Sequence, residues 1–144
     1  MPVNRTFAEI KMTSTFLNVD LEIRSSEQPA LIEKELEERR VLNLFSGEIE
    51  DGHLSTFEVN LKKEEENTPD HLISEFCKII EQFGDEAKKE WNDASDRVFD
   101  IGYESPKSEK HTLEQLKEET RIAIEGLGAR INFTTHKQHD ANQS

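Results

Sequence analysis

Hydrophobic and polar residues alternate along several short segments of the chain. The clearest is FLNVDLEI at 16–23, where the apolar residues from Leu17 to Ile23 share one side and Asn18, Asp20 and Glu22 share the other. A period of two indicates a strand with one buried face, because successive side chains of a strand point to opposite sides. The same alternation recurs in VFDIGY at 98–103 and in RINFTT at 130–135. These segments predict three strands of a half-buried sheet.

A hairpin is predicted where Asp51-Gly52 separates two further alternating segments, within VLNLFSGEIEDGHLSTFEVNLK at 41–62. Asp-Gly favours a tight turn, since Gly tolerates positive φ. Centred on these two residues, the turn sets Glu50 opposite His53 and places Leu44 opposite Val59. Ile49 and Leu54 then fall on the other side of the hairpin. They either cover something near the turn, or Gly47 marks a bulge that shifts the alternation.

Helical periodicity separates these strands. Ser25 and Gln28 resemble a capping box before the first helix, and Thr68 with Pro69 and Asp70 predicts the start of a second. A shorter helix is expected at 85–94. The last is expected after Thr112, with a second capping-box pattern at its start.

The predicted order is therefore β-α-β-β-α-β-α-β, which gives an α+β domain. Its first six elements match the ferredoxin-like arrangement, and an αβ unit extends it. We expect a mainly antiparallel sheet of about five strands with the helices on one face. The predicted organisation is an N-terminal segment at 1–14, one domain at 15–135 and a disordered tail at 136–144.

Charge narrows the classes of partner. The chain has 144 residues, of which 34% are charged and 33% hydrophobic, and its net charge is −13. This net negative charge disfavours nucleic acid and anionic membranes as partners, because binding to them requires clustered Lys and Arg. It permits a basic protein partner, although solubility alone also explains a large net charge. Cys77 is the one cysteine, and in the apolar run EFCKII we expect it to be a reduced core thiol. Without a signal-like or membrane-spanning segment, we expect a cytoplasmic protein.

Acidic residues are expected to collect on the helix-free face of the sheet. Asp20 and Asp100 each stand between two core-facing apolar residues, and Glu58 has the same place in the hairpin. In a ferredoxin-like order their three strands are neighbours, so the carboxylates would form a row. Carboxylates at the spacing of adjacent strands repel one another. Arg97 or Arg130 could relieve that repulsion.

The predicted role of this face is docking of a basic, toxin-like partner, and the simpler alternative is a face that only keeps the protein soluble. An alternative of another class is a small enzyme or ligand-binding domain that uses Asp20, Glu58 and Asp100, and a third is a DNA mimic. Because the chain has none of the common nucleotide, metal or nucleophile motifs, we assign no catalytic residue, cofactor or metal and expect binding rather than catalysis. The sequence also leaves a homodimer as an alternative, formed through a sheet edge or through exposed Phe45, Ile49 and Leu54. The candidate partner-binding residues are Asp20, Glu22, Glu58, Asp100 and Glu104.

Four segments, FLNVDLEI, EFCKIIEQF, WNDASDRVFDIGYES and LGARINFTT, carry a family resemblance. Over about residues 15–135 the chain resembles a family of small bacterial cytoplasmic proteins of unknown function. The pattern WxxASxRVFDIG is its most specific part. The resemblance implies no catalytic residues. Because some small acidic α+β proteins are immunity proteins that neutralise a toxin, it implies an immunity-type binding role by analogy of fold.

Overall fold

The computed structural model describes residues 16–59, 64–104 and 108–136. In this part of the chain five strands form one sheet in the order β2-β3-β1-β4-β5. The predicted segment 1–14, and the predicted tail apart from His136, lie outside the described residues. The strands are β1 (Phe16–Ser25), β2 (Val41–Ile49), β3 (Gly52–Val59), β4 (Asp96–Tyr103) and β5 (Arg130–Thr135). The helices are α2 (Ala30–Glu38), α3 (Pro69–Glu81), α4 (Asp85–Asp93), α5 (Ser108–Gln115) and α6 (Glu118–Gly126), with a 3-10 turn η1 (Glu64–Glu66).

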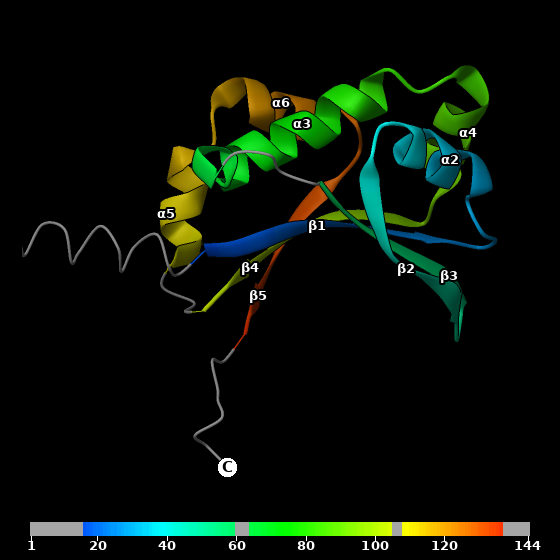
Figure 1. Ribbon diagram of the computed structural model, residues 1–144, viewed down its shortest axis with the longest axis horizontal. Coiled ribbons are helices and arrows are strands. Elements are labelled where there is room, and N and C mark those ends of the chain that lie inside the picture. The colour runs from blue at the N-terminus through cyan, green and yellow to red at the C-terminus, as the bar shows by residue number, and fades with distance from the viewer. Residues whose placement is uncertain (1–15, 60–63, 105–107, 137–144) are drawn as a thin grey trace, which may run out of the picture.

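The strand neighbours follow the ferredoxin-like expectation. Strand β1 pairs with β3 on one side and β4 on the other, and both ladders are antiparallel, as is the β2–β3 hairpin. Strand β5 adds to β4 in parallel, through a crossover that contains α5 and α6. The helices α2, α3, α4 and α6 lie on the same side of the sheet, with α5 near one end (Figure 1). The predicted α+β class is therefore confirmed, with a mixed sheet.

The core lies between this sheet and its helices. Alternate residues of β1 face the helices, and Val19, Leu21 and Ile23 are at most 1% exposed. The wide apolar stripe of α3 packs on them, and the rings of Phe76 in α3 and Phe99 in β4 lie 5.7 Å apart. Burying one such side chain contributes about 1.5–3 kcal/mol. This one-sided burial leaves the opposite face of the sheet to polar residues.

The predicted register of the hairpin is wrong. The turn consists of Glu50 and Asp51, so that Ile49 lies opposite Gly52 and Glu48, rather than Glu50, lies opposite His53. The register also shifts between Asn43 and Phe45, so the bulged residue is Leu44 and not Gly47, which one of the two predicted alternatives named. Strand β2 is exposed along most of its length, so burial does not fix its pairing in the way that it does for β1.

The predicted capping box at the first helix is also wrong. Ser25 ends β1, and α2 begins at Ala30 with no side-chain hydrogen bond from its N-cap residue. Instead Glu90 of α4 accepts hydrogen bonds from the backbone N–H groups of Leu31 and Ile32, both at 3.0 Å. A carboxylate at a helix N-terminus satisfies donors that have no partner within the helix. Helix α2 is thus capped by a residue distant in sequence.

Candidate functional site

The predicted row of carboxylates is present on the helix-free face of the sheet. Asp20 of β1 lies directly opposite Asp100 of β4, and Asp100 lies opposite Asn132 of β5. On the other side of Asp20, the amide of Asn18 donates to both Asp20 and Glu58, at 3.3 Å each. We call Glu58, Asp20 and Asp100 the acidic row. It crosses three adjacent strands, which are spaced about 4.8 Å apart.

Among the described residues, the hydrogen-bond donors that orient the acidic row are neutral amides and a hydroxyl. Oδ1 of Asp100 accepts a hydrogen bond from the Asn132 amide at 2.9 Å and another from the Thr134 hydroxyl at 2.7 Å. The Asn18 amide bridges the other two carboxylates. These donors fix the positions of the oxygens without neutralising them. Sequence reasoning placed Asn18 on this face, but it did not identify Asn18 or Thr134 as hydrogen-bond donors to the carboxylates.

The row is electrostatically unfavourable at its centre. The pKa of Asp20 is raised from 3.8 to about 6 by partial burial and then by the negative charges of Glu58, Asp100 and Glu22. The pKa of Glu22, the next residue on this face of β1, is also raised by burial and by Asp100, while Arg24 and Arg130 oppose that rise. A carboxylate whose pKa is raised in this way would be stabilised in its charged form by a cation placed beside it.

Neither of the two arginines expected to relieve the row forms a salt bridge with Asp20, Glu58 or Asp100 among the described residues. Arg130 pairs with Asp96 at 2.9 Å, beyond the row's end. Arg97 points to the helix side of the sheet, where its guanidinium lies over the ring of Trp91 and donates to the backbone oxygens of Trp91, Ala94 and Gly128. For Arg97 the expectation was therefore wrong, and Arg97 instead ties α4 and the α6–β5 connection to β4.

Gly102 lets Asn18 and His136 approach β4 closely beside the acidic row. A Cβ atom there would lie 2.5 Å from Oδ1 of Asn18 and 3.2 Å from the ring of His136. The β1–β4 register shifts between Phe16 and Asn18, at this same point, so Gly102 accompanies a bulge, as its position in the sequence suggested. When protonated, His136 lowers the pKa of Asp20, and its backbone N–H donates to the Tyr103 oxygen at 2.7 Å.

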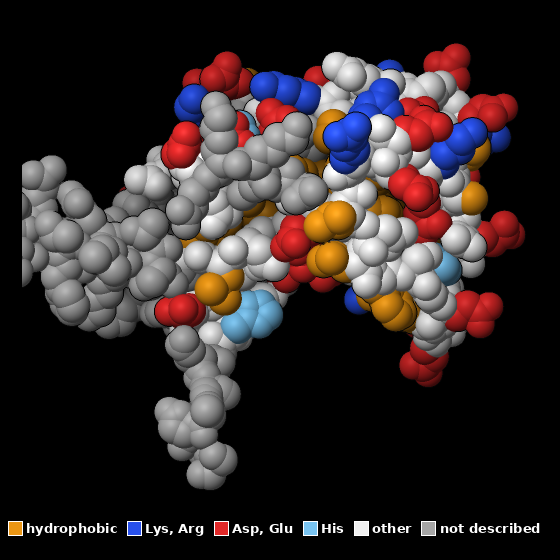
Figure 2. All heavy atoms as spheres, in the orientation of Figure 1, with side chains coloured by type: hydrophobic (Ala, Val, Ile, Leu, Met, Phe, Trp, Pro, Cys, Tyr) orange, Lys and Arg blue, Asp and Glu red, His pale blue; other side chains and the backbone are white. Residues whose placement is uncertain are grey.

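The five candidate partner-binding residues do not all join the row. Glu22 lies on the same face of the sheet as the row, two residues after Asp20 in β1. Glu104 follows β4 and lies outside the strand. Apolar side chains lie on the neighbouring hairpin instead. Leu42 lies opposite Glu58, and Leu42 and Phe45 are 44% and 48% exposed. Figure 2 shows hydrophobic side chains at the surface in the region of β2 and β3, with acidic groups close by.

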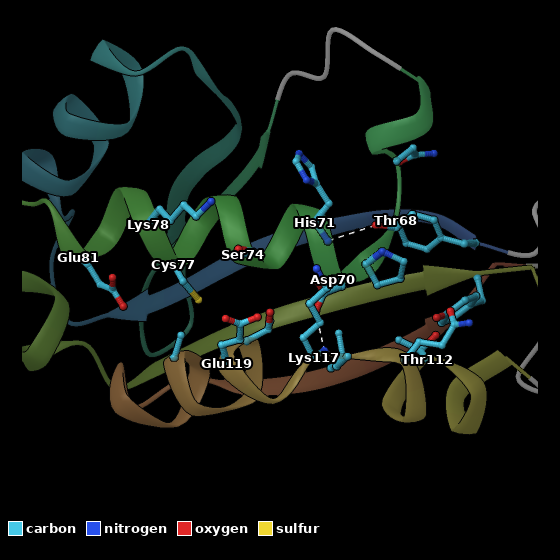
Figure 3. A pocket seen from close by; sticks show the side chains of 18 residues that line it. Thr68, Asp70, His71, Ser74, Cys77, Lys78, Glu81, Thr112, Lys117 and Glu119 are labelled. Carbon is cyan, nitrogen blue, oxygen red and sulfur yellow. Dashed lines mark hydrogen bonds between the residues drawn. The ribbon is translucent and has the colours of Figure 1, made fainter.

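A cavity of about 980 Å³ lies elsewhere, between α3 and the α5–α6 segment (Figure 3). Its charged groups are mixed: Asp70, Glu81 and Glu119 against Lys78 and Lys117. Asp70 accepts a hydrogen bond from the backbone N–H of Lys117 at 2.8 Å and so joins the start of α3 to the start of α6. None of the candidate partner-binding residues lines this cavity.

Cys77 also lines the cavity, and Figure 3 shows its sulfur pointing from α3 toward α6. It is 3% exposed, as expected of a core thiol. Burial raises the pKa of this thiol to about 12. Because the thiolate is the nucleophilic form, the shift works against a catalytic role.

A polar network that the sequence did not predict joins the hairpin to α2. Glu33 accepts hydrogen bonds from the hydroxyls of Ser46 and Ser55 at 2.6 and 2.9 Å, and Nε2 of His53 lies 2.9 Å from the Ser46 oxygen. Since the single Ser46 proton goes to Glu33, His53 must donate through Nε2–H. A His nitrogen that carries a proton cannot serve as a base toward Ser46. The network is therefore structural rather than a nucleophile with its base.

Within the described part of the chain, no group of three or more His, Cys, Asp or Glu side chains is arranged to hold a metal ion. No helix among the described residues is long and apolar enough to cross a membrane. Comparisons of the chain with family models, with curated proteins and with solved structures gave no match. The family resemblance described above therefore stays a prediction, and any function must be argued from the site.

Proposed function

We propose that the protein is a binding module that docks a basic protein partner on the helix-free face of its sheet. The observation that carries the proposal is the acidic row. Asp20, Asp100 and Glu58 are held by neutral donors, and none of the salt bridges found among the described residues involves them. A Lys or Arg side chain from a partner would supply the missing counter-charge.

Neighbouring groups support this proposal and refine it. Leu42 and Phe45 offer apolar contact area beside Glu58, so the fitting partner surface has basic residues next to apolar ones. Electrostatic complementarity speeds association and sets register, while apolar contact slows dissociation. An immunity-type role, in which the basic partner is a toxin, is the specific form of this proposal that the family resemblance suggests.

The direct test uses a defined cationic probe. We would titrate a short oligolysine peptide into ¹⁵N-labelled protein and follow backbone amide shifts. The expected shifts centre on Asp20, Asp100 and Glu58, and affinity falls as salt rises. The double variant Asp20→Asn with Asp100→Asn should weaken binding about tenfold, which corresponds to about 1.4 kcal/mol.

The matched control removes the same amount of charge from the helix side. Glu114 and Glu125 are exposed on α5 and α6, and Glu114→Gln with Glu125→Gln also changes the net charge by two. This control should leave most of the affinity intact. If both double variants lose affinity equally, the probe responds to net charge alone and the docking proposal fails.

The enzyme alternative gains no support from the described cavity. That cavity is lined by neither Asp20, Glu58 nor Asp100, and it lies among the helices on the other side of the sheet. A catalytic role for these carboxylates requires a concave site around them that excludes water.

A further inference from the structure

The edge of the sheet at β2, to which no other described strand pairs, differs from the rest of the surface. Strand β2 is the terminal strand of the sheet, and residues 42–46 are all exposed. Leu42, Leu44 and Phe45 are 44%, 50% and 48% exposed. An edge strand presents unpaired backbone N–H and C=O groups, and proteins normally protect it with charged residues, proline, a β-bulge or a covering element.

Among the described residues, the bulge at Leu44 is the one protection of this kind along 41–47. The stretch VLNLFSG, residues 41–47, contains no charged residue and no proline, although 34% of the chain is charged. The bulge at Leu44 interrupts pairing with β3 and adds one more apolar side chain to the exposed segment. An uncharged, apolar edge of this length favours pairing with another strand.

The charges that flank this stretch indicate which strand would pair with it. Arg39 and Arg40 precede it, and Glu48, Glu50 and Asp51 follow it. In an antiparallel pair of two β2 strands, the arginines just before each strand meet the acidic end of the other. With a twofold axis at Leu44, Arg40 of one copy lies opposite Glu48 of the second. The edge is thus complementary in charge to itself.

We propose that two copies of the chain pair through β2, antiparallel about a twofold axis perpendicular to the sheet. This contact is isologous, and it joins the two sheets into one. Both helix layers then lie on one side and both acidic rows on the other. The proposal is independent of the basic partner proposed above.

Repulsion between the two copies does not prevent this arrangement. Asp20 lies two strands in from the edge, so the two Asp20 residues are five strand spacings apart, or about 24 Å. The two Glu58 residues on β3 are three spacings apart, about 14 Å. Both distances exceed the screening length of about 8 Å at physiological salt. Leu42 and Phe45 of each copy fill the space between the acidic rows.

The test is sedimentation velocity over a range from low micromolar to near-millimolar protein at physiological salt. The expected result is a reversible rise in mass from the 16.7 kDa of one chain to that of two. The variant Arg40→Glu should weaken the dimer about tenfold or more, because the axis repeats the change at both ends of the strand pair. Adding Glu48→Arg to that variant should restore the dimer.

The matched control is Lys88→Glu on α4, which makes the same change in charge on an exposed helix residue and should leave the dimer intact. Circular dichroism of each variant confirms that it is folded. A monomer at every concentration would overturn the proposal and leave the edge for a strand from another protein. Equal weakening by Arg40→Glu and Lys88→Glu, or no rescue by Glu48→Arg, would place the contact elsewhere and would also overturn it.

Discussion

Replacing Asp20 with Asn should stabilise the protein near neutral pH. The pKa of Asp20 is raised from 3.8 to about 6, first by burial and then by the charges of its neighbours. Between about pH 4 and pH 6 the folded state therefore binds more protons at this site than the unfolded state. The contribution of Asp20 to the free energy of unfolding consequently falls as pH rises through this window. Above pH 6 the full penalty for its charged form applies. Asn carries no charge, so the variant should not incur it.

The size of the effect follows from the same values. One pKa unit between the folded and unfolded states corresponds to about 1.4 kcal/mol, so a rise from 3.8 to about 6 sets an upper limit of about 3 kcal/mol. Asp20 is only half-buried, and solvent screening reduces this figure. We expect Asp20→Asn to increase the free energy of unfolding at pH 7.5 by about 1–2 kcal/mol and to change it little at pH 4.

Urea denaturation of both proteins at a series of pH values measures this difference. Comparing wild type with Asp20→Asn isolates Asp20 from Glu22, whose pKa is also raised, and from Asp96, whose pKa is lowered by Arg130. The control Asp93→Asn, at an exposed position on α4, should shift stability by no more than about 0.5 kcal/mol. If Asp20→Asn destabilises the protein, or if its effect does not depend on pH between 4 and 7, the acidic row is not strained.

Two further pairs of substitutions, each a test with its control, probe the framework around β4 and the hairpin. Arg97→Ala removes the hydrogen bonds to four backbone oxygens and the contact with Trp91, and should cost about 2–3 kcal/mol by urea denaturation. Arg130→Ala, which removes an exposed ion pair, should cost less than about 1 kcal/mol. Similar losses in these two variants would show that Arg97 does not hold the helices to β4. Gly52→Ala should cost at least about 2 kcal/mol, because Gly52 has φ +141° and an added Cβ would lie 2.4 Å from a backbone oxygen of β1. The control Gly126→Ala, with no atom within 4 Å of the added Cβ, should be neutral or stabilising in thermal melts. If Gly52→Ala is equally well tolerated, the hairpin geometry is contradicted.

The central strands and their acidic row were predictable from the sequence because burial acts on them strongly. In β1 and β4, one face packs against helices, so alternation identifies which side each residue takes. A ferredoxin-like order then makes these strands neighbours, and Asp20 falls opposite Asp100 as predicted. A slip of one residue would place Leu21 and Phe99 in water, which is why the register is well defined.

The features that the sequence did not predict depend on weak or distant interactions. Strand β2 buries little, so the hairpin register was set by turn geometry and by a bulge at Leu44 rather than by an apolar face. The cap of α2 comes from Glu90, 58 or more positions away in the chain. The side chain of Arg97 contacts the ring of Trp91, which lies on the opposite side of the sheet from the row. None of these contacts has a local sequence signature.

Two separate measurements can test the acidic row for function. The free energy of unfolding measures what the row costs in stability, and the affinity for the cationic probe measures its proposed use in binding. If Asp20→Asn raises the free energy of unfolding, the wild-type protein keeps a carboxylate that its fold would be more stable without. Groups of this kind are typical of binding surfaces, where stability is lost in exchange for affinity. A stabilising substitution that also weakens the cationic probe would therefore link the strain to binding. A stabilising substitution that leaves the probe's affinity unchanged would mean that the strained carboxylate serves no cationic partner, and the proposed docking face would fail even though the electrostatic reasoning held.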